Sequence, residues 1–305
     1  MLIYSPYGRS ATPVPYCVDV TATSPRASGV TALVRALVRA SHPEPTVAVT
    51  AFSALLASTA GNDAGRCILM AAAVFTGQLS IGWSNDRIDA DDDRQVGRAN
   101  KPLANAGLSF RTIEWAIAVA LIATTVLSLS LGWRAGSVHL AAVACGWLYN
   151  AWLKRSWWSW LPYAAAFGAL PAVATLSLPG HPGPAAWVML GGALLGIAAN
   201  LTNALPDLVN DRLVDARGLP HRIGARPSLV LSVGLLVSAT LCVVLGPRGP
   251  VTVLGWSGLS LTVAIVVAIS PLLWRRPETR IPFYGLVALV PIDLVLLAVD
   301  GQHLH

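Results

Sequence analysis

NDRIDADDD, residues 85–93, ends an apolar run that begins near Cys67, and its aspartates recur at helical spacing. A second acidic stretch, DLVNDRLVD at residues 207–215, ends another apolar run later in the chain. Positions four residues apart lie along one face of an α-helix, so each stretch predicts an acidic helix face. The residues at that spacing are Asn85, Asp89 and Asp93 in the first stretch and Asp207, Asp211 and Asp215 in the second.

Carboxylates stacked along a helix repel one another and destabilise it. We therefore expect a cation to lie between these side chains. Oxygen ligands of this kind suit Mg²⁺, which proteins usually hold with a few carboxylates together with the phosphates of a substrate. The paired stretches thus predict a site for Mg²⁺ and a phosphorylated substrate.

The composition is that of a membrane protein. Of the 305 residues, 54% are hydrophobic and only 12% are charged, against about 25% charged in a typical soluble domain. The mean hydropathy is +0.60. The four cysteines are dispersed without metal-ligand spacing, which is typical of small buried hydrophobic residues. The net charge of +6 comes from basic residues between apolar runs, so it indicates membrane topology and no nucleic-acid partner.

The order of the segments predicts an all-α polytopic membrane protein. Residues 1–29 are polar and read as a mobile N-terminal tail, and residues 30–41 read as a helix on the membrane surface. Residues 30–305 form the second unit, a bundle of nine transmembrane helices around a central cavity. The nine apolar runs lie at residues 46–61, 67–86, 110–133, 135–153, 157–178, 184–206, 227–246, 250–273 and 281–299.

The positive charges predict the orientation. Of the 21 lysines and arginines, all except Arg66, Arg134 and Arg248 fall on one side of the predicted spans. The positive-inside rule makes that side cytoplasmic. It places the N-terminus and both acidic stretches in the cytoplasm, at the ends of spans two and six, and His305 outside. If the source is bacterial, the membrane is the plasma membrane.

At this point several segments resemble the UbiA-type intramembrane prenyltransferase superfamily. Residues 85–93 match its NDxxDxxxD signature, and residues 207–215 match its second Asp-rich motif. RANKPLAN at residues 98–105 is similar to the basic Pro-Leu loop after the first motif, and residues 149–155 are similar to the Tyr-then-Lys element after span four. The resemblance covers about residues 30–299. It implies prenyl transfer from an isoprenyl diphosphate, held through Mg²⁺, to a lipophilic and preferentially aromatic acceptor in the membrane.

The resemblance also implies roles for individual residues, and it places the first span, which residues 42–45 precede, in the lining of the acceptor pocket. The catalytic residues would be Asp86, Asp89, Asp207 and Asp211. The substrate-binding residues would be Asn85, Lys101, Tyr149, Lys154, Asn203 and Arg217. The metal ligands would be Asn85, Asp86, Asp89, Asp93, Asp207, Asp211 and Asp215.

The chemistry of the residues agrees with these roles. An allylic diphosphate ionises when its leaving group is neutralised, which metal ions held by carboxylates achieve. Lysine and arginine add charge-assisted contacts to the phosphates. The allylic carbocation then needs a dry apolar cavity, because water would capture it. Such a cavity is available in a bundle of membrane helices.

Three other interpretations remain open. The acids of the first stretch could form a solvated helix end, neutralised by Arg87, Arg94 and Arg98, and Asp91 is expected to face solvent in either case. The protein could be a terpene cyclase of the same superfamily, in which the ionised chain closes on itself without an acceptor. It could also be a non-enzymatic Mg²⁺ transporter or scaffold, although both acidic stretches gather at one membrane face. Asp293 is an acid within the ninth span, so a function is suspected for it.

Overall fold

The computed structural model is helical throughout the residues that it describes, and no strand occurs among them. The predicted N-terminal tail, except for Gly29, lies outside the described residues. So do Asp211, Asp215 and Arg217. The described residues are 29–95, 97, 101–104, 107–208, 218–299 and 304.

Each of the nine predicted apolar runs coincides with one helix, and a further amphipathic helix, α1, precedes them. The helices before the midpoint of the chain are α1 (Val30–Ala40), α2 (Pro43–Thr59), α3 (Ala64–Gln95), α4 (Phe110–Ser130) and α5 (Trp133–Ala151). After the 3₁₀ turn Leu153–Arg155 come α6 (Leu161–Leu176) and α7 (Ala186–Ala204), which leads into the 3₁₀ turn Leu205–Asp207. The remaining helices are the short α9 (Leu219–Ile223), α10 (Ala225–Leu245), α11 (Val253–Arg275) and α12 (Ile281–Val299).

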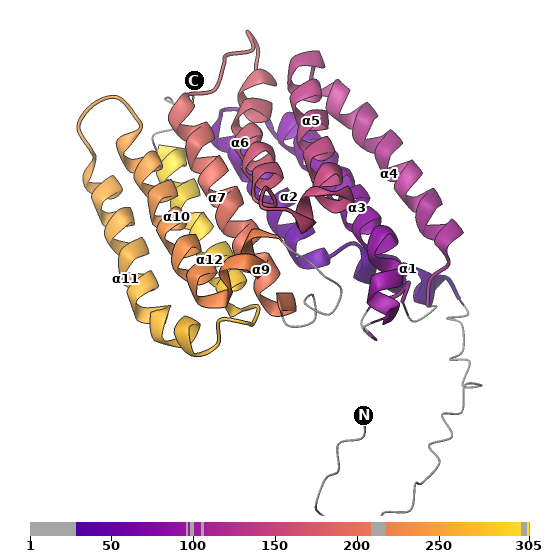
Figure 1. Ribbon diagram of the computed structural model, residues 1–305. Helices are drawn as coiled ribbons and strands as arrows, with labels where there is room; N and C mark the ends of the chain where they lie inside the picture. The colour runs from indigo at the N-terminus through magenta and orange to yellow at the C-terminus, as the bar shows by residue number, and fades with distance from the viewer. Residues whose placement is uncertain are drawn as a thin grey trace, which may run out of the picture.

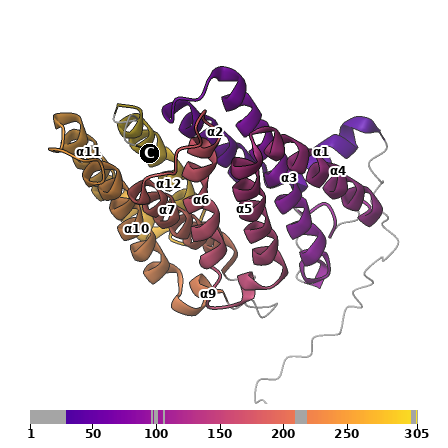
Figure 2. The same ribbon diagram turned by 90° about the horizontal axis from the view of Figure 1, so that it is seen from above.

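The long helices lie side by side in one bundle (Figure 1). Six of them, α2, α3, α5, α6, α7 and α12, pack in succession around a cavity and each contributes to its wall. Viewed from above, α2 lies on one side of the bundle and α5, α6 and α7 on the other (Figure 2). Helices α4, α10 and α11 pack on the outside. The sequence predicts that all nine helices surround the cavity, whereas six of the nine line it in the structure.

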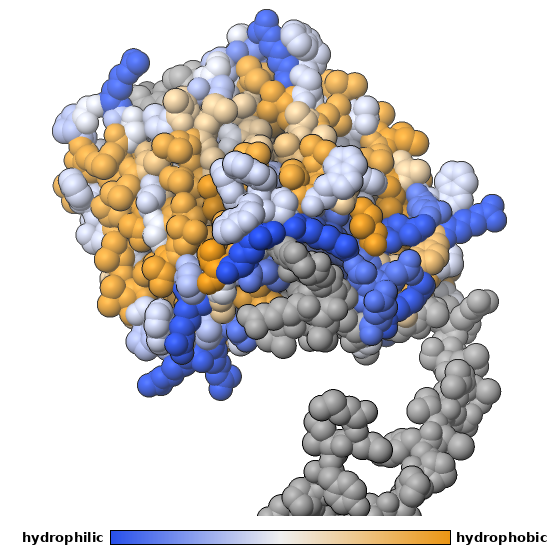
Figure 3. Space-filling model, viewed as in Figure 1, coloured by the Kyte–Doolittle hydropathy of each residue, from blue (hydrophilic) through white to orange (hydrophobic). Residues whose placement is uncertain are grey.

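Several helices have the length and composition of membrane spans. Among the described residues, six qualify by these two criteria, namely α3, α4, α7, α10, α11 and α12, and α6 is a shorter apolar helix. Hydrophobic side chains cover the middle of the face shown in Figure 3, and hydrophilic side chains gather toward its lower end. The chain is an integral membrane protein. How many of the nine helices cross the membrane stays a prediction.

Helix α3 carries the first acidic stretch and is the longest helix of the bundle, with 32 residues. Its first half is apolar, and its last turns hold the acids of residues 85–93. Gly97 follows its end with φ +68, the left-handed conformation that glycine adopts readily after a helix. The acidic segment is thus an uninterrupted continuation of a membrane helix, and its side chains have fixed positions relative to the cavity.

Helices α6 and α7 pack with unusually close backbones. A Cβ atom at Gly196 would lie 2.3 Å from the carbonyl oxygen of Tyr163, and one at Gly192 would lie 2.7 Å from that of Phe167. Small residues at such points let membrane helices approach each other closely. This contact fixes the positions of Tyr163 and Phe167 on α6 relative to Asn203 on α7, and all three residues line a cavity.

Candidate active site

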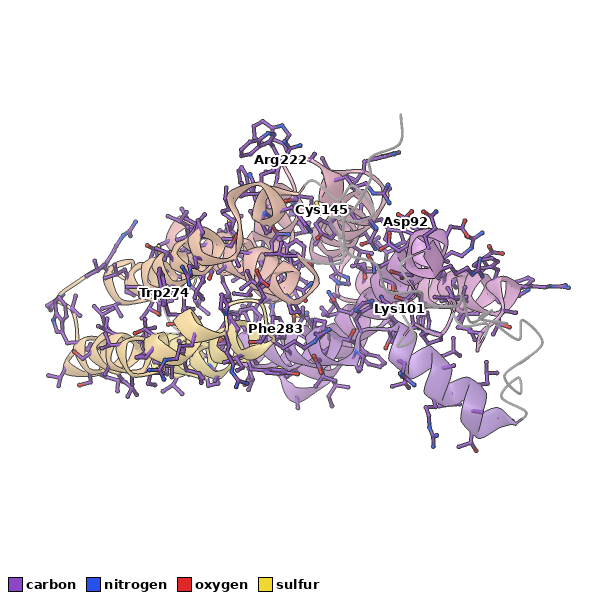
Figure 4. The ribbon with its side chains drawn as sticks, turned by 60° about the horizontal axis from the view of Figure 1, so that its bottom comes forward. Asp92, Lys101, Cys145, Arg222, Trp274 and Phe283 are labelled. Atoms are coloured by element: carbon purple, nitrogen blue, oxygen red, sulfur yellow. The ribbon has the colours of Figure 1, made fainter. Side chains whose placement is uncertain are left out.

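The central cavity has a volume of about 660 Å³ and changes character along its length. Its deeper wall is mostly apolar, with side chains such as Phe52, Val74, Leu170 and Leu195. Acidic, basic and amide side chains gather where α3 and α7 end. Figure 4 brings this end of the molecule forward and shows Asp92 and Lys101, with Phe283 of α12 toward the opposite wall. The cavity can therefore accept a molecule with an apolar body and a charged head.

The first acidic stretch lies in the wall of this polar end. Asn85, Asp89 and Asp93 follow one another along one side of α3, and all three line the cavity. Asp92 also lines it. Asp91 is on the far side, where its side chain is 82% exposed and pairs with Arg94 at 3.0 Å. The helix thus separates acids that face the cavity from an acid that faces solvent, as the spacing predicts for Asp91.

Asp86 differs from its neighbours because it is almost completely buried, with 1% exposure. Its Oδ1 forms an ion pair with Lys101 and lies 3.1 Å from Nε2 of His42. The same Nε2 lies 3.0 Å from Nζ of Lys101 and 3.5 Å from Nδ2 of Asn85. The other carboxylate oxygen, Oδ2, is buried without a hydrogen-bond partner in the described part of the chain. A buried, unsatisfied carboxylate oxygen is costly, so this atom suits a cation.

The 3₁₀ turn after α5 supplies two further cations. Lys154 forms an ion pair with Asp89, and both side chains are largely buried. Arg155 pairs with Asp92 at the rim. Lys101 and Lys154 were both predicted from the sequence to contact the substrate, and both line the cavity. Here each of them also neutralises one carboxylate of the first stretch.

A break in the helix precedes the second acidic stretch. Helix α7 ends at Ala204, and Pro206 follows inside the 3₁₀ turn that ends at Asp207. Asn203, in the last turn of α7, lines the cavity, and its Nδ2 lies 3.5 Å from the hydroxyl of Tyr163. The predicted acidic face formed with Asp211 and Asp215 lies outside the described residues.

The segment that follows the second stretch packs against the turn between α5 and α6. A Cβ atom at Gly218 would lie 2.6 Å from the carbonyl oxygen of Lys154, whose side chain pairs with Asp89. The backbone N–H of Leu219 donates to Oγ of Ser159 at 2.9 Å. The turn between α5 and α6 therefore contacts both ends of the site, with Asp89 on one side and Gly218 on the other.

Aromatic side chains form the wall next to the acids. Tyr149 and Tyr163 contact each other edge to face, with 5.0 Å between ring centroids, and Tyr163 stacks on Phe167 at 6.4 Å. All three line the cavity. Aromatic faces stabilise cations by their quadrupole, so this wall can shield a carbocation from other partners.

Several wall residues were missed by the sequence analysis as candidate site residues. His42 lies at the corner between α1 and α2 with an unusual φ of +52, and it lines the cavity. In the sequence, only its position before the Pro-Glu-Pro start of a helix indicated a role. Arg155 was counted as a topology signal. His139 and Gln78 lie within apolar runs and also line the cavity. Asp293 is buried in α12 and is absent from the cavity lining among the described residues.

The donor set fits Mg²⁺. Asn85, Asp89 and Asp93 present oxygen atoms to the cavity, and the buried Oδ2 of Asp86 lacks a partner among the described residues. No three acidic, histidine or cysteine side chains of the described chain are close enough to hold a metal by themselves. This is consistent with an ion that takes only one or two protein carboxylates and completes its shell with phosphate oxygens.

Comparison with solved structures identifies the fold. A UbiA homolog from Aeropyrum pernix K1 is 19% identical, with a TM-score of 0.66, over 84% of this chain and 98% of its own. A UbiA homolog from Archaeoglobus fulgidus, bound to GPP and Mg²⁺, is 15% identical, with a TM-score of 0.66, over 88% of this chain and 98% of its own. A digeranylgeranylglyceryl phosphate synthase is 16% identical, with a TM-score of 0.60, over 88% and 98% of the two chains.

At these identities the structural similarity establishes the fold alone. No curated protein matches the chain. The profile of the UbiA prenyltransferase family, however, matches residues 46–284, which include both acidic stretches and most of the residues that line the cavity. The chain therefore belongs to the UbiA prenyltransferase family.

Proposed function

We propose that this protein transfers an isoprenyl group from an isoprenyl diphosphate to a lipophilic acceptor inside the membrane, with Mg²⁺ as cofactor. The observation that carries the proposal is the polarity of the cavity. Acidic side chains of α3 and the lysines 101 and 154 gather at one end, and the rest of the wall is mostly apolar. The family membership and the Archaeoglobus fulgidus relative bound to GPP and Mg²⁺ support the same reading.

In this proposal the residues 85, 89 and 93 on α3, together with the second acidic stretch, hold Mg²⁺ against the diphosphate. When bound, Mg²⁺ neutralises the charge that develops on the departing diphosphate. Lys101 and Lys154 lie in the same wall and bind phosphate oxygens by charge-assisted hydrogen bonds. Tyr149, Tyr163 and Phe167 exclude water from the allylic carbon and face its positive charge.

The membrane orientation belongs to the same proposal. The N-terminus and both acidic stretches face the cytoplasm, His305 lies outside, and in a bacterium the membrane is the plasma membrane. The distribution of lysine and arginine supports this orientation. A Mg²⁺ transporter is disfavoured because the acids that line the cavity collect at one end of it.

The test uses the full chain in lipid nanodiscs with radiolabelled isoprenyl diphosphates of several lengths and Mg²⁺. We expect diphosphate release that depends on Mg²⁺, together with a prenylated product when a suitable aromatic acceptor is supplied. A cyclic hydrocarbon or alcohol formed without any acceptor would identify a terpene cyclase instead. No diphosphate release at any chain length would contradict both enzymatic readings.

A further inference from the structure

His139 is a polar side chain in the mostly apolar wall of the cavity. It is 3% exposed and lies on α5, ten residues before Tyr149. At 1.5 Å per residue, that separation places it about 15 Å along the helix axis from Tyr149. On the facing helix α3, Gln78 also lines the cavity and lies seven residues, or about 10 Å, before Asn85. The two side chains therefore lie far from the atoms that react at the diphosphate.

One side of the imidazole is held by a specific contact. Nδ1 of His139 lies 2.6 Å from Oγ of Ser128 on α4, and that hydroxyl donates to the carbonyl oxygen of Thr124 at 2.5 Å. A serine hydroxyl has one proton, so with this proton on Thr124 it accepts a hydrogen bond from Nδ1–H. The geometry assigns the neutral tautomer that is protonated on Nδ1, which leaves a lone pair on Nε2.

The other side of the imidazole is open. Among the described residues Nε2 has no hydrogen-bond partner, and its neighbour on α3 is Gly77. A Cβ atom at Gly77 would lie 3.6 Å from Nε2 and 2.9 Å from a methyl group of Val143. The glycine therefore brings the backbone of α3 close to the ring without offering Nε2 a side-chain partner, and Gln78, which follows it directly, also lines the cavity.

A plain isoprenyl tail has no hydrogen-bond donor to offer to Nε2 of His139. Burying an imidazole nitrogen against hydrocarbon without a hydrogen bond is unfavourable, because its hydration is lost and not replaced. The large majority of buried side-chain nitrogens in proteins have a hydrogen-bond partner. Ser128 satisfies Nδ1 only. The occupant of this part of the cavity is thus expected to carry a hydrogen-bond donor.

We propose that His139, positioned by Ser128, binds a hydroxyl or N–H group of the acceptor. The acceptor is then an elongated, two-ended lipophilic molecule. One end presents the atom that is alkylated near Tyr149, and the other carries a hydrogen-bond donor about 10–15 Å away. This inference rests on the proposed prenyl transfer, because it describes the second substrate of that reaction.

The test uses two probes that differ by one hydroxyl, 4-phenylphenol and biphenyl. Their affinities for the full-length protein in nanodiscs are measured relative to empty nanodiscs, so that partition into lipid cancels. A single neutral hydrogen bond corresponds to a preference of about three- to tenfold for the phenol. His139→Phe keeps an aromatic ring of similar size and should reduce that preference to about one. Equal affinities in the wild type, or a preference that survives in His139→Phe, would overturn the proposal.

A second measurement covers the case in which a variant fails to fold. In protein labelled with ¹⁵N-histidine, Nε2 of His139 should resonate as an unprotonated imidazole nitrogen and should shift when 4-phenylphenol is added. The signal is assigned by elimination, as the one that no single substitution at the other five histidines removes. A protonated Nε2, or no shift on addition of the phenol, would overturn the proposal without any variant that binds the probes.

Two controls separate this role from others. His181→Asn removes an exposed histidine whose Nδ1 contacts the carbonyl oxygen of Leu176 outside the cavity, and it should leave the phenol preference unchanged. Binding of geranyl diphosphate with Mg²⁺ should be equal in wild type and His139→Phe. If diphosphate release fails in all proteins, prenyl transfer is wrong, yet the phenol preference still reports on His139. A cyclic product that forms without acceptor and changes in His139→Phe would contradict the acceptor assignment.

Discussion

The two acidic stretches have the same residue spacing but begin differently. The first continues α3 without interruption to Gln95, so its acids keep helical positions along the cavity wall. The second begins after α7 has ended at Ala204, in a 3₁₀ turn that contains Pro206. Proline lacks an N–H and its ring crowds the carbonyl of the residue four positions earlier, so the α-helix does not continue regularly there. Equal spacing therefore does not mean that both stretches continue the preceding helix without a break.

The difference also concerns charge. Asp86, Asp89 and Asp92 of the first stretch are each paired with a lysine or arginine from a loop. One of these loops, which carries Lys154 and Arg155, also contacts Gly218 just after the second stretch. We infer that the first stretch is a preformed half of the site, and that its coupling to the second runs through this loop. Four predictions test this comparison.

The largest effect is expected from removal of the metal. Without Mg²⁺ the two acidic stretches would repel each other and the diphosphate, so turnover in excess EDTA should fall to background. Addition of Mg²⁺ or Mn²⁺ should restore it. Full activity in EDTA, measured as diphosphate release in nanodiscs, would show that the stretches do not share a metal.

The next largest effect is the loss of turnover when one acid in either stretch is replaced. Asp89→Asn and Asp211→Asn are nearly isosteric and remove one anionic ligand each. We expect at least about a hundredfold loss of turnover in either variant, since 1.36 kcal/mol corresponds to a factor of ten. The double variant should lose less than the product of the single losses if both acids hold one cluster. Asp91→Asn is the matched control, because that side chain is exposed on the same helix.

Turnover of the control variant Asp91→Asn should fall by much less than tenfold. Wild-type turnover in Asp89→Asn, or collapse of a folded Asp91→Asn, would mean that a different face of α3 carries the chemistry. An additive double variant would separate the two stretches into independent sites.

A smaller effect concerns stability. Lys101→Met leaves the buried carboxylate of Asp86 without its cation, which should destabilise the protein by about 3–5 kcal/mol. Adding Asp86→Asn removes the buried charge and should recover part of the loss. Thermal melting in detergent without substrate measures both. Asp91→Asn breaks an exposed pair on the same helix and should leave the melting temperature nearly unchanged. Equal melting of the Lys101→Met and Asp91→Asn variants would contradict a preformed first half.

The last prediction concerns membrane topology and not turnover. Single cysteines at Ala99 and Gly180, in a background without native cysteines, should label from opposite sides of the membrane. Ala99 follows the first stretch and should label from the cytoplasmic side, whereas Gly180 lies between α6 and α7 and should label from outside. A cysteine at Ala216, directly after the second stretch, should behave like Ala99. Labelling of the two stretches from different sides would end the idea of a shared site.

Much of the architecture could be predicted because it depends on local pattern. Apolar runs of membrane length gave nine helices, and the four-residue period placed Asn85, Asp89 and Asp93 on one wall. The family profile confirmed the resemblance. The sequence did not reveal that six helices line the cavity, because that depends on how the helices pack.

The contact partners of individual side chains could not be predicted from the sequence either. His42 and Asp86 are 44 residues apart in the sequence. Ser128 and His139 lie on different helices, α4 and α5, so no periodicity links either pair. The end of α7 at Ala204 could have been anticipated from Pro206, but the regular spacing of the acids outweighed that signal. The roles of Asp211, Asp215 and Arg217 stay predictions.

The length of α3 has a consequence for kinetics. Its 32 residues correspond to about 48 Å of helix, whereas the hydrocarbon layer is about 30 Å thick. The acidic turns therefore extend into the water layer beside the lipid head groups, where the head of a membrane-borne diphosphate also lies. Both partners are then confined to a thin sheet, and encounters depend on how many donor molecules occupy each unit of membrane area. Diluting the donor with inert lipid should slow the reaction, while diluting the whole suspension with buffer should not.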